Sequence, residues 1–105
     1  MIDALLKELE PLVFQEKFRA NLQWPPFHSQ HEGVAVIDEE VEEAAEEVRR
    51  AAECFRNLRY QVYKDFAPEQ ISRTRDGLRM RSLRAAAELI QVAAMCDKFG
   101  DINDG

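Results

Sequence analysis

The stretch VAVIDEEVEEAAEEVRRAAECFRNLRYQV, residues 34–62, decides the fold. Its apolar side chains recur in alternating steps of three and four residues, and they are Val34, Ile37, Val41, Ala44, Val48, Ala51, Phe55, Leu58 and Val62. This spacing continues without a slip and is typical of a helix that carries a coiled-coil-like seam. We therefore predict one long helix over residues 30–64.

Local signals mark both ends of this helix. Ser29 and Glu32 have the spacing of a capping box, in which the serine hydroxyl accepts a backbone hydrogen bond and the glutamate reaches back. Pro68 closes the segment that ends the helix, because proline cannot continue it. A helix over residues 30–64 is roughly 50 Å long, more than the rest of a 105-residue chain can cover. We therefore expect self-association, as a homodimer or a homotetramer.

Two further helices flank the long one. Residues 3–22 carry a broad apolar side, and the proline pair Pro25-Pro26 interrupts helical structure after them. A third helix is expected over residues 69–99, followed by a helix stop and a disordered tail at residues 100–105. The predicted fold class is all-α. Residues 1–105 form a single domain, an antiparallel bundle of three main helices completed by homo-oligomerisation.

The composition indicates the cellular compartment and the classes of partner to expect. Cys54 and Cys96 each fall inside an apolar helical pattern, which favours reduced, buried thiols in a cytoplasmic protein. The first residues form no basic leader, and no apolar run reaches the roughly 18 residues of a membrane span, so we expect no membrane partner. A net charge of −6 argues against binding to a nucleic acid polymer.

The charged residues form two blocks. Residues 38–47 hold seven carboxylates, whereas five arginines crowd a later stretch, at Arg73, Arg75, Arg79, Arg81 and Arg84. An arginine cluster can hold phosphates. It can equally be a solvated helix face or a partner of the acidic block. Both interpretations remain at this stage.

Two pairs of polar side chains stand three residues apart on predicted helices. Glu40 and Glu43 lie beside the seam, where glutamates usually serve solubility and pairing between helices. Glu88 and Gln91 interrupt residues 85–96, which are otherwise apolar on every side and so indicate a buried helix. A buried carboxylate must be protonated, paired or bound to a metal. The arginines considered for pairing are Arg49 and Arg84.

Brought together, the two pairs would form an oxygen-rich cluster between helices. Hard oxygen ligands suit Mg²⁺, with Mn²⁺ as the alternative, whereas thiolates or histidines would indicate zinc. The metal hypothesis therefore names four ligands, Glu40, Glu43, Glu88 and Gln91.

The same residues carry a resemblance to a known family. The segment Ser29-x-His31-Glu32-Gly33-x-Ala35-Val36-Ile37-x-Glu39-Glu40-x-x-Glu43, followed by Glu88-Leu89-Ile90-Gln91-Val92-Ala93-Ala94-Met95, resembles the MazG-like proteins of the all-α nucleoside triphosphate pyrophosphohydrolase superfamily, in particular small, often phage-associated members. The resemblance implies a homo-oligomer that binds Mg²⁺ and splits a nucleoside triphosphate into a monophosphate and pyrophosphate. It maps the metal-binding carboxylates onto Glu40, Glu43 and Glu88. Glu39 is the next candidate, as a catalytic carboxylate that orients the attacking water.

The sequence departs from the family pattern in two places. Position 91 is glutamine where the broad superfamily has aspartate, so the site keeps an oxygen but loses one negative charge. The gap between Glu43 and Glu88 is longer than the family's usual spacing. Our first hypothesis is a nucleoside triphosphate pyrophosphohydrolase or a weakened relative. The second is a noncatalytic helical oligomer with the same fold, acting as a scaffold or interaction protein.

Candidate substrate contacts come from two other parts of the chain. The phosphates could be held by Arg79, Arg81 or Arg84, including across a subunit boundary. Trp24 and Phe27 could stack on the base, although aromatic residues beside prolines also seal the ends of helical bundles.

Overall fold

The computed structural model describes residues 1–104 and is helical almost throughout. It consists of α1 (Ile2–Gln23), α2 (Gln30–Tyr63) and α3 (Pro68–Gly100), followed by a short 3-10 helix, η1 (Asp101–Asp104). No strand occurs in this part of the chain. The all-α class is confirmed, and the bounds of each main helix lie within one residue of those predicted.

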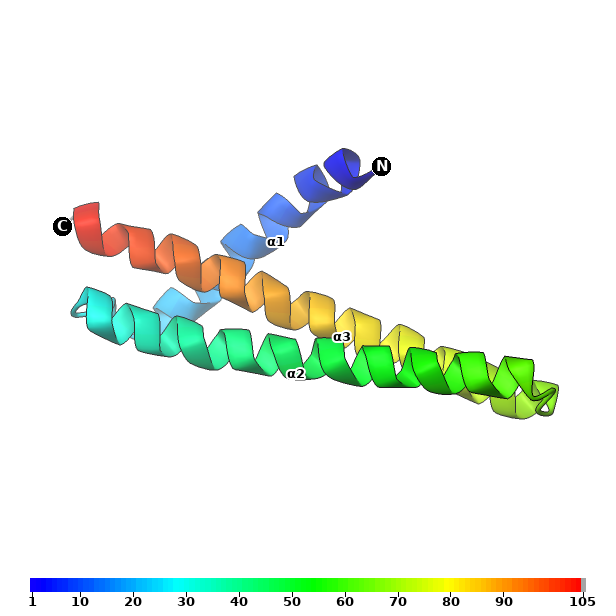
Figure 1. Ribbon diagram of the computed structural model, residues 1–105. Coiled ribbons are helices and arrows are strands. Elements are labelled where there is room, and N and C mark those ends of the chain that lie inside the picture. Colours follow the sequence, from blue (N-terminus) through cyan, green and yellow to red (C-terminus); the bar gives the residue numbers. More distant parts are fainter. Residues whose placement is uncertain (105) are drawn as a thin grey trace.

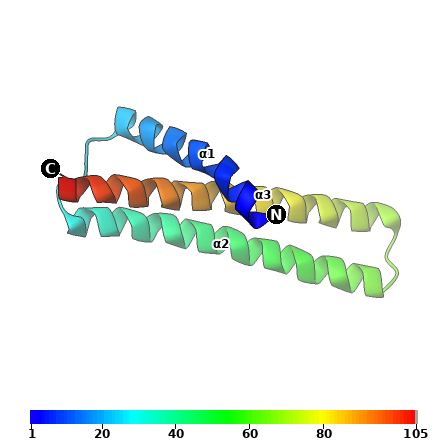
Figure 2. The same ribbon diagram turned by 90° about the horizontal axis from the view of Figure 1, so that it is seen from above.

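The helices α2 and α3 form a long antiparallel hairpin, and α1 crosses α3 (Figures 1 and 2). The N-terminal half of α1 then diverges from the hairpin (Figure 1). The molecule measures 60 × 28 × 22 Å, with a radius of gyration of 17.8 Å. A compact domain of this length has a radius of gyration of about 13 Å, so the chain is much more elongated than a typical monomer.

The start of α2 confirms the predicted capping signal. Ser29 is the N-cap, and its Oγ accepts a hydrogen bond of 3.1 Å from the backbone N–H of Glu32. The Glu32 carboxylate in turn accepts the backbone N–H of His28 at 3.3 Å. The first of these bonds occupies a backbone donor that the first turn of a helix leaves free, and the second ties the residue before the N-cap to the helix.

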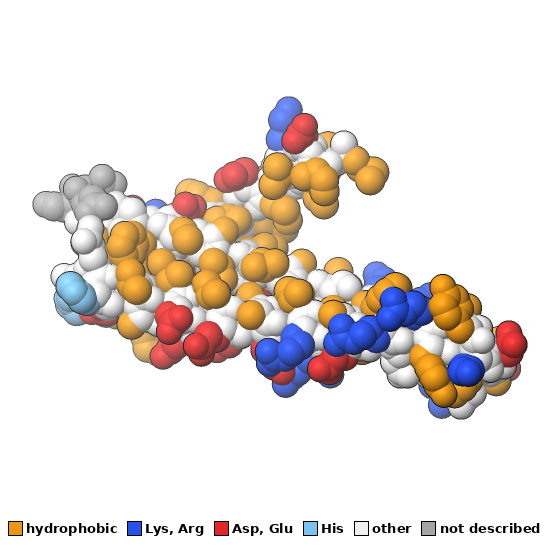
Figure 3. All heavy atoms as spheres, in the orientation of Figure 1, with side chains coloured by type: hydrophobic (Ala, Val, Ile, Leu, Met, Phe, Trp, Pro, Cys, Tyr) orange, Lys and Arg blue, Asp and Glu red, His pale blue; other side chains and the backbone are white. Residues whose placement is uncertain are grey.

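The seam of α2 divides into two rows with different surroundings. One row faces the hairpin, with Ala44 buried and Ile37, Ala51 and Leu58 half-buried. The other row stays between 45% and 57% exposed, and its members are Val34, Val41, Val48, Phe55 and Val62. Hydrophobic side chains accordingly form a band along the face of the hairpin that Figure 3 shows. Within residues 1–104, α3 covers only half of the predicted seam.

The helices α1 and α3 are also less covered than the sequence indicated. No residue of α1 is buried. In α3, the stretch over residues 85–96 was expected to be buried on all sides, but Leu89 is half-exposed and Cys96 is exposed. This expectation was wrong because neither α1 nor α2 covers that side of α3. Cys54 and Cys96 are both free thiols.

The predicted disordered tail is corrected for residues 101–104. These residues continue α3 as η1, and the backbone N–H of Asp101 bonds the carbonyls of Lys98 and Phe99. An ion pair of 2.9 Å between Lys17 Nζ and Asp101 Oδ2 ties the segment to α1. Gly105 lies outside the described residues. Across the described chain, no helix is long and apolar enough to cross a membrane.

Candidate metal centre and adjoining pocket

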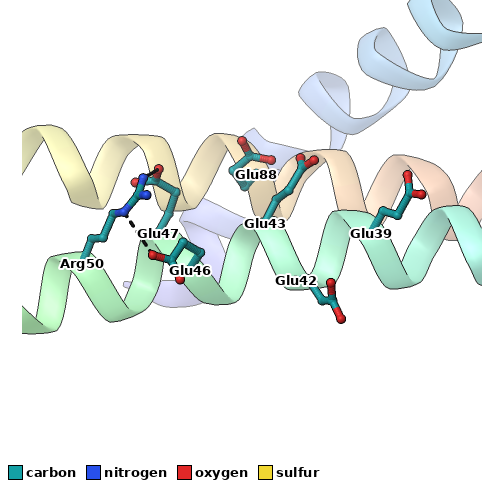
Figure 4. A pocket seen from close by; sticks show the side chains of 7 residues that line it. All are labelled: Glu39, Glu42, Glu43, Glu46, Glu47, Arg50 and Glu88. Carbon is teal, nitrogen blue, oxygen red and sulfur yellow. Dashed lines mark hydrogen bonds and ion pairs between the residues drawn. The ribbon is translucent and has the colours of Figure 1, made fainter.

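Three glutamates from two helices meet at the middle of the hairpin. Glu40 and Glu43 stand three residues apart on α2 and therefore share a face, and the antiparallel α3 brings Glu88 opposite them. Each offers one carboxylate oxygen, and these oxygens all lie within 4.8 Å of one another. Figure 4 shows Glu43 and Glu88 extending toward each other from the two helices. We call Glu40, Glu43 and Glu88 the acid cluster.

The surroundings of the acid cluster favour neutral carboxyl groups. Partial burial raises the pKa of Glu40, and the charges of Glu43, Glu88 and Glu39 raise it further. Partial burial also raises the pKa of Glu88, together with the charge of Glu43, a hydrogen bond with Glu43 and the charge of Glu47. Repulsion among like charges at this range is the condition that a bound cation relieves.

No arginine neutralises Glu88 in the described structure. Arg49, the first arginine considered, pairs with Glu46. Arg84, the second, forms no ion pair within residues 1–104. The nearby cations go instead to Glu47, which contacts Arg50 at 3.1 Å and Arg81 at 3.6 Å. The acid cluster therefore has no cationic partner among the described residues, whereas the neighbouring Glu47 is paired.

Gln91 lies beside the acid cluster but turns its amide nitrogen elsewhere. Its Nε2 donates a hydrogen bond of 2.8 Å to Oε2 of Glu16 on α1. Glu16 also pairs with Arg19. The amide nitrogen is thus committed to α1, and only the Oε1 atom of Gln91 remains for a metal.

Three adjoining hollows run along the hairpin. The middle one, of about 320 Å³, is lined by the acid cluster, Ala87 and Gln91. A second, of about 400 Å³, shares Glu43 and Glu88 and extends to Arg50 (Figure 4). The third, which we call the end pocket, has a volume of about 810 Å³ and shares Glu40 and Gln91 with the middle hollow. It lies where the C-terminal turns of α1, the α1–α2 loop and the last turns of α3 meet.

The structure brings some predicted substrate residues to these hollows and leaves others outside. Trp24 and Phe27 both line the end pocket. None of Arg79, Arg81 and Arg84 lines any of the three hollows. Arg81 is engaged with Glu47, because it precedes Glu88 by seven residues, about two turns of α3, and so lies beside a later part of α2 than the acid cluster does.

Glu39, the predicted water-orienting residue, stands outside the acid cluster. It lines both the end pocket and the hollow that extends to Arg50. Figure 4 shows its side chain on the N-terminal side of Glu43 along α2. Its charge still contributes to the raised pKa of Glu40.

Three residues of the site were missed by the sequence reasoning. Glu16 accepts a hydrogen bond from Gln91, Glu47 forms ion pairs with the nearby arginines, and Lys98 lies in the wall of the end pocket. The density of acids at residues 38–47 included Glu47 but did not single it out. No sequence signal marks Glu16 or Lys98, because their roles depend on how α1 crosses α3.

Comparison of the chain with protein-family models, with curated proteins and with solved structures found no match in any of the three.

Proposed function

We propose that the protein is a Mg²⁺-dependent nucleoside triphosphate pyrophosphohydrolase, or a weakened relative of such enzymes. One observation carries the proposal: three carboxylates from two helices converge within 4.8 Å without a cationic partner in the described chain. An arrangement of this kind is electrostatically unfavourable on its own, and a divalent cation removes the penalty.

The donor set fits Mg²⁺. Two oxygens bound at about 2.1 Å to one ion lie at most about 4.2 Å apart, so small side-chain rotations would close the acid cluster around it. Oxygen-only ligands of high charge are those that Mg²⁺ and Mn²⁺ prefer. A bound Mg²⁺ would supply neutralisation of the phosphate charge.

The remaining roles fall to the chain's own residues. Glu39, which lines the hollows on both sides, orients the attacking water toward the phosphate chain. The end pocket receives the nucleoside, and the exposed Trp24 ring in its wall provides a stacking surface. Because Arg79 and Arg84 lie outside the hollows of their own chain, we assign them to the phosphates bound by a second copy.

The exposed surface supports a second copy of the chain as partner. A compact monomer of 12.1 kDa exposes about 6,000 Å², whereas this chain exposes 7944 Å². The excess of about 1,900 Å² matches what each subunit of an obligate dimer buries. The exposed row of α2 seam residues repeats every seven positions, which is the pattern that another helix covers in a coiled coil. We propose a homo-oligomer held along this row.

One observation favours the second hypothesis, a noncatalytic oligomer. Gln91 supplies no charge and gives its amide nitrogen to Glu16, so the site offers three carboxylates rather than four. A fold kept for assembly alone needs neither the metal nor the substrate.

Pyrophosphate release separates the two hypotheses. The purified chain is incubated with Mg²⁺ and a panel of ribo- and deoxyribonucleoside triphosphates. We expect release from at least one of them, reduced roughly a hundredfold in Glu88→Gln. The control Glu53→Gln removes an exposed carboxylate on α2 outside the hollows and should retain the activity. If the wild-type protein releases no pyrophosphate from any member of the panel, the enzyme hypothesis is contradicted and the scaffold hypothesis is favoured.

A further inference from the structure

A buried lysine stands in the wall of the end pocket. Lys98, near the end of α3, has only 4% of its surface exposed. Its Nζ lies over the ring of Phe27, 4.6 Å from the ring centroid. Within residues 1–104 this ammonium makes no hydrogen bond and no ion pair. The stem of Lys98 is therefore buried, whereas its Nζ is not among the polar atoms that are sealed from solvent without a partner and can still contact a molecule in the pocket.

Such a group requires acceptors. An ammonium has three N–H donors, and a ligand that displaces water from them must offer acceptors in its place. The ring face of Phe27 attracts the charge but provides no oxygen atom. The lining of the end pocket is mixed: apolar side chains such as Trp24, Val36 and Met95 stand among charged and amide side chains, of which Lys98 is a donor without a protein acceptor in the described chain. Polar groups placed in this way give a binding pocket its specificity.

The acids of the end pocket do not supply the missing acceptor. Glu16 is engaged by Gln91 and Arg19, and Glu32 accepts the backbone N–H of His28. Glu39 and Glu40 also line the pocket, toward the acid cluster. Along α3, Lys98 follows Glu88 by ten residues, which is about 15 Å of helix. The lysine and the acid cluster thus line two adjoining hollows, which share Glu40 and Gln91.

This separation indicates which part of a nucleotide each end contacts. If the acid cluster holds a metal and the phosphates, the nucleoside reaches toward Lys98. One face of Phe27 is already covered by the ammonium, so Phe27 holds the lysine in place rather than stacking on a base. Trp24, which is 66% exposed, remains as the stacking side chain.

We propose that Lys98 is a specificity residue that donates a hydrogen bond to a carbonyl oxygen on the edge of the nucleobase. The identity of the ligand as a nucleotide rests on the proposed function. Uracil, thymine, cytosine and guanine carry such a carbonyl, whereas adenine carries none. The pocket therefore selects carbonyl-bearing bases against adenine.

Calorimetric titrations without metal test this proposal. Wild-type protein in EDTA is titrated with UMP, GMP and AMP, and with inorganic pyrophosphate as a probe that has no base. We expect UMP or GMP to bind more tightly than AMP. Lys98→Met keeps the aliphatic stem and should weaken binding of the preferred nucleotide by about tenfold to a hundredfold, with AMP unchanged. Lys64→Met, an exposed lysine at the far end of the hairpin, is the control.

The outcomes separate this inference from the proposed function. Equal binding of AMP and the carbonyl-bearing nucleotides by the wild type overturns it, even if Lys98→Met fails to fold. The inference is also overturned if Lys98→Met weakens the binding of AMP and pyrophosphate as much as the binding of UMP, because the lysine then contacts phosphate. It is overturned as well if no nucleotide binds to the wild type. Lys98-dependent base selection in a protein that releases no pyrophosphate supports the inference while the enzymatic proposal fails. Release of pyrophosphate without base selection supports the proposed function and overturns this inference.

Discussion

Replacing Glu88 by glutamine should stabilise the metal-free protein and abolish its response to Mg²⁺. The substitution keeps the shape of the side chain and removes one of three converging charges. At 4.8 Å, two unit charges in a water-like dielectric repel by about 0.9 kcal/mol. Glu88 faces two such charges, and screening by salt and partial exposure reduce the total to about 1 kcal/mol. For a domain of this size, that corresponds to a rise in Tm of about 4–8 °C.

Thermal unfolding at fixed protein concentration measures both effects. In EDTA near neutral pH, Glu88→Gln should melt above the wild type. Mg²⁺ at ten times its Kd should add about 1.4 kcal/mol to the stability of the wild type and nothing to the variant. The control is Glu42→Gln, because the Glu42 side chain points away from the acid cluster (Figure 4). A variant that melts below the wild type in EDTA, or that gains as much from Mg²⁺, refutes the electrostatic reasoning.

Three further predictions concern pH, assembly and packing. The pKa values of Glu40 and Glu88 are raised above the ordinary 4.5 in the folded protein, so protonation of these two groups favours the folded state. As the pH falls from about 7 toward 4.5, the metal-free wild type should therefore gain stability relative to Glu88→Gln. A constant difference between the two Tm values over that range contradicts this. Val48→Glu, on the exposed seam row, should lower the mass seen by light scattering, and an unchanged oligomer would show that the row is not the interface. Gly33→Ala places a Cβ 2.6 Å from Cδ2 of Phe99, so urea unfolding should show a loss of about 1–3 kcal/mol. The matched Gly77→Ala, which meets nothing within 4 Å, should gain up to about 1 kcal/mol from helix propensity, and an equal loss in both would contradict the packing argument.

The heptad spacing and the capping residues were sufficient to predict the helices, whereas the acid cluster was a hypothesis from two polar pairs and a resemblance to a known family. Glu40 and Glu43 share a face because they are three residues apart on a helix, and an antiparallel third helix brings Glu88 to them. The sequence could not show which row of the seam α3 would cover, because the rotation of a helix depends on its packed neighbour. Gln91 binding Glu16, and Lys98 packing under Phe27, depend on where α1 crosses α3. Periodicity within one helix does not encode that crossing.

The distribution of arginines bears on whether the acid cluster has a function. Arg50 and Arg81 contact Glu47, which lies one turn of α2 beyond Glu43. Ion pairs between carboxylates and arginines therefore do form in this part of the hairpin. A chain that needed only to fold and associate would gain stability from an arginine near Glu88, or from a neutral residue in its place. The hairpin instead leaves the closest group of its carboxylates without a counter-charge at the centre of its hollows. This contrast between the paired Glu47 and the unpaired acid cluster is the observation on which the proposed cation site rests, and the response of the wild type and Glu88→Gln to Mg²⁺ tests it.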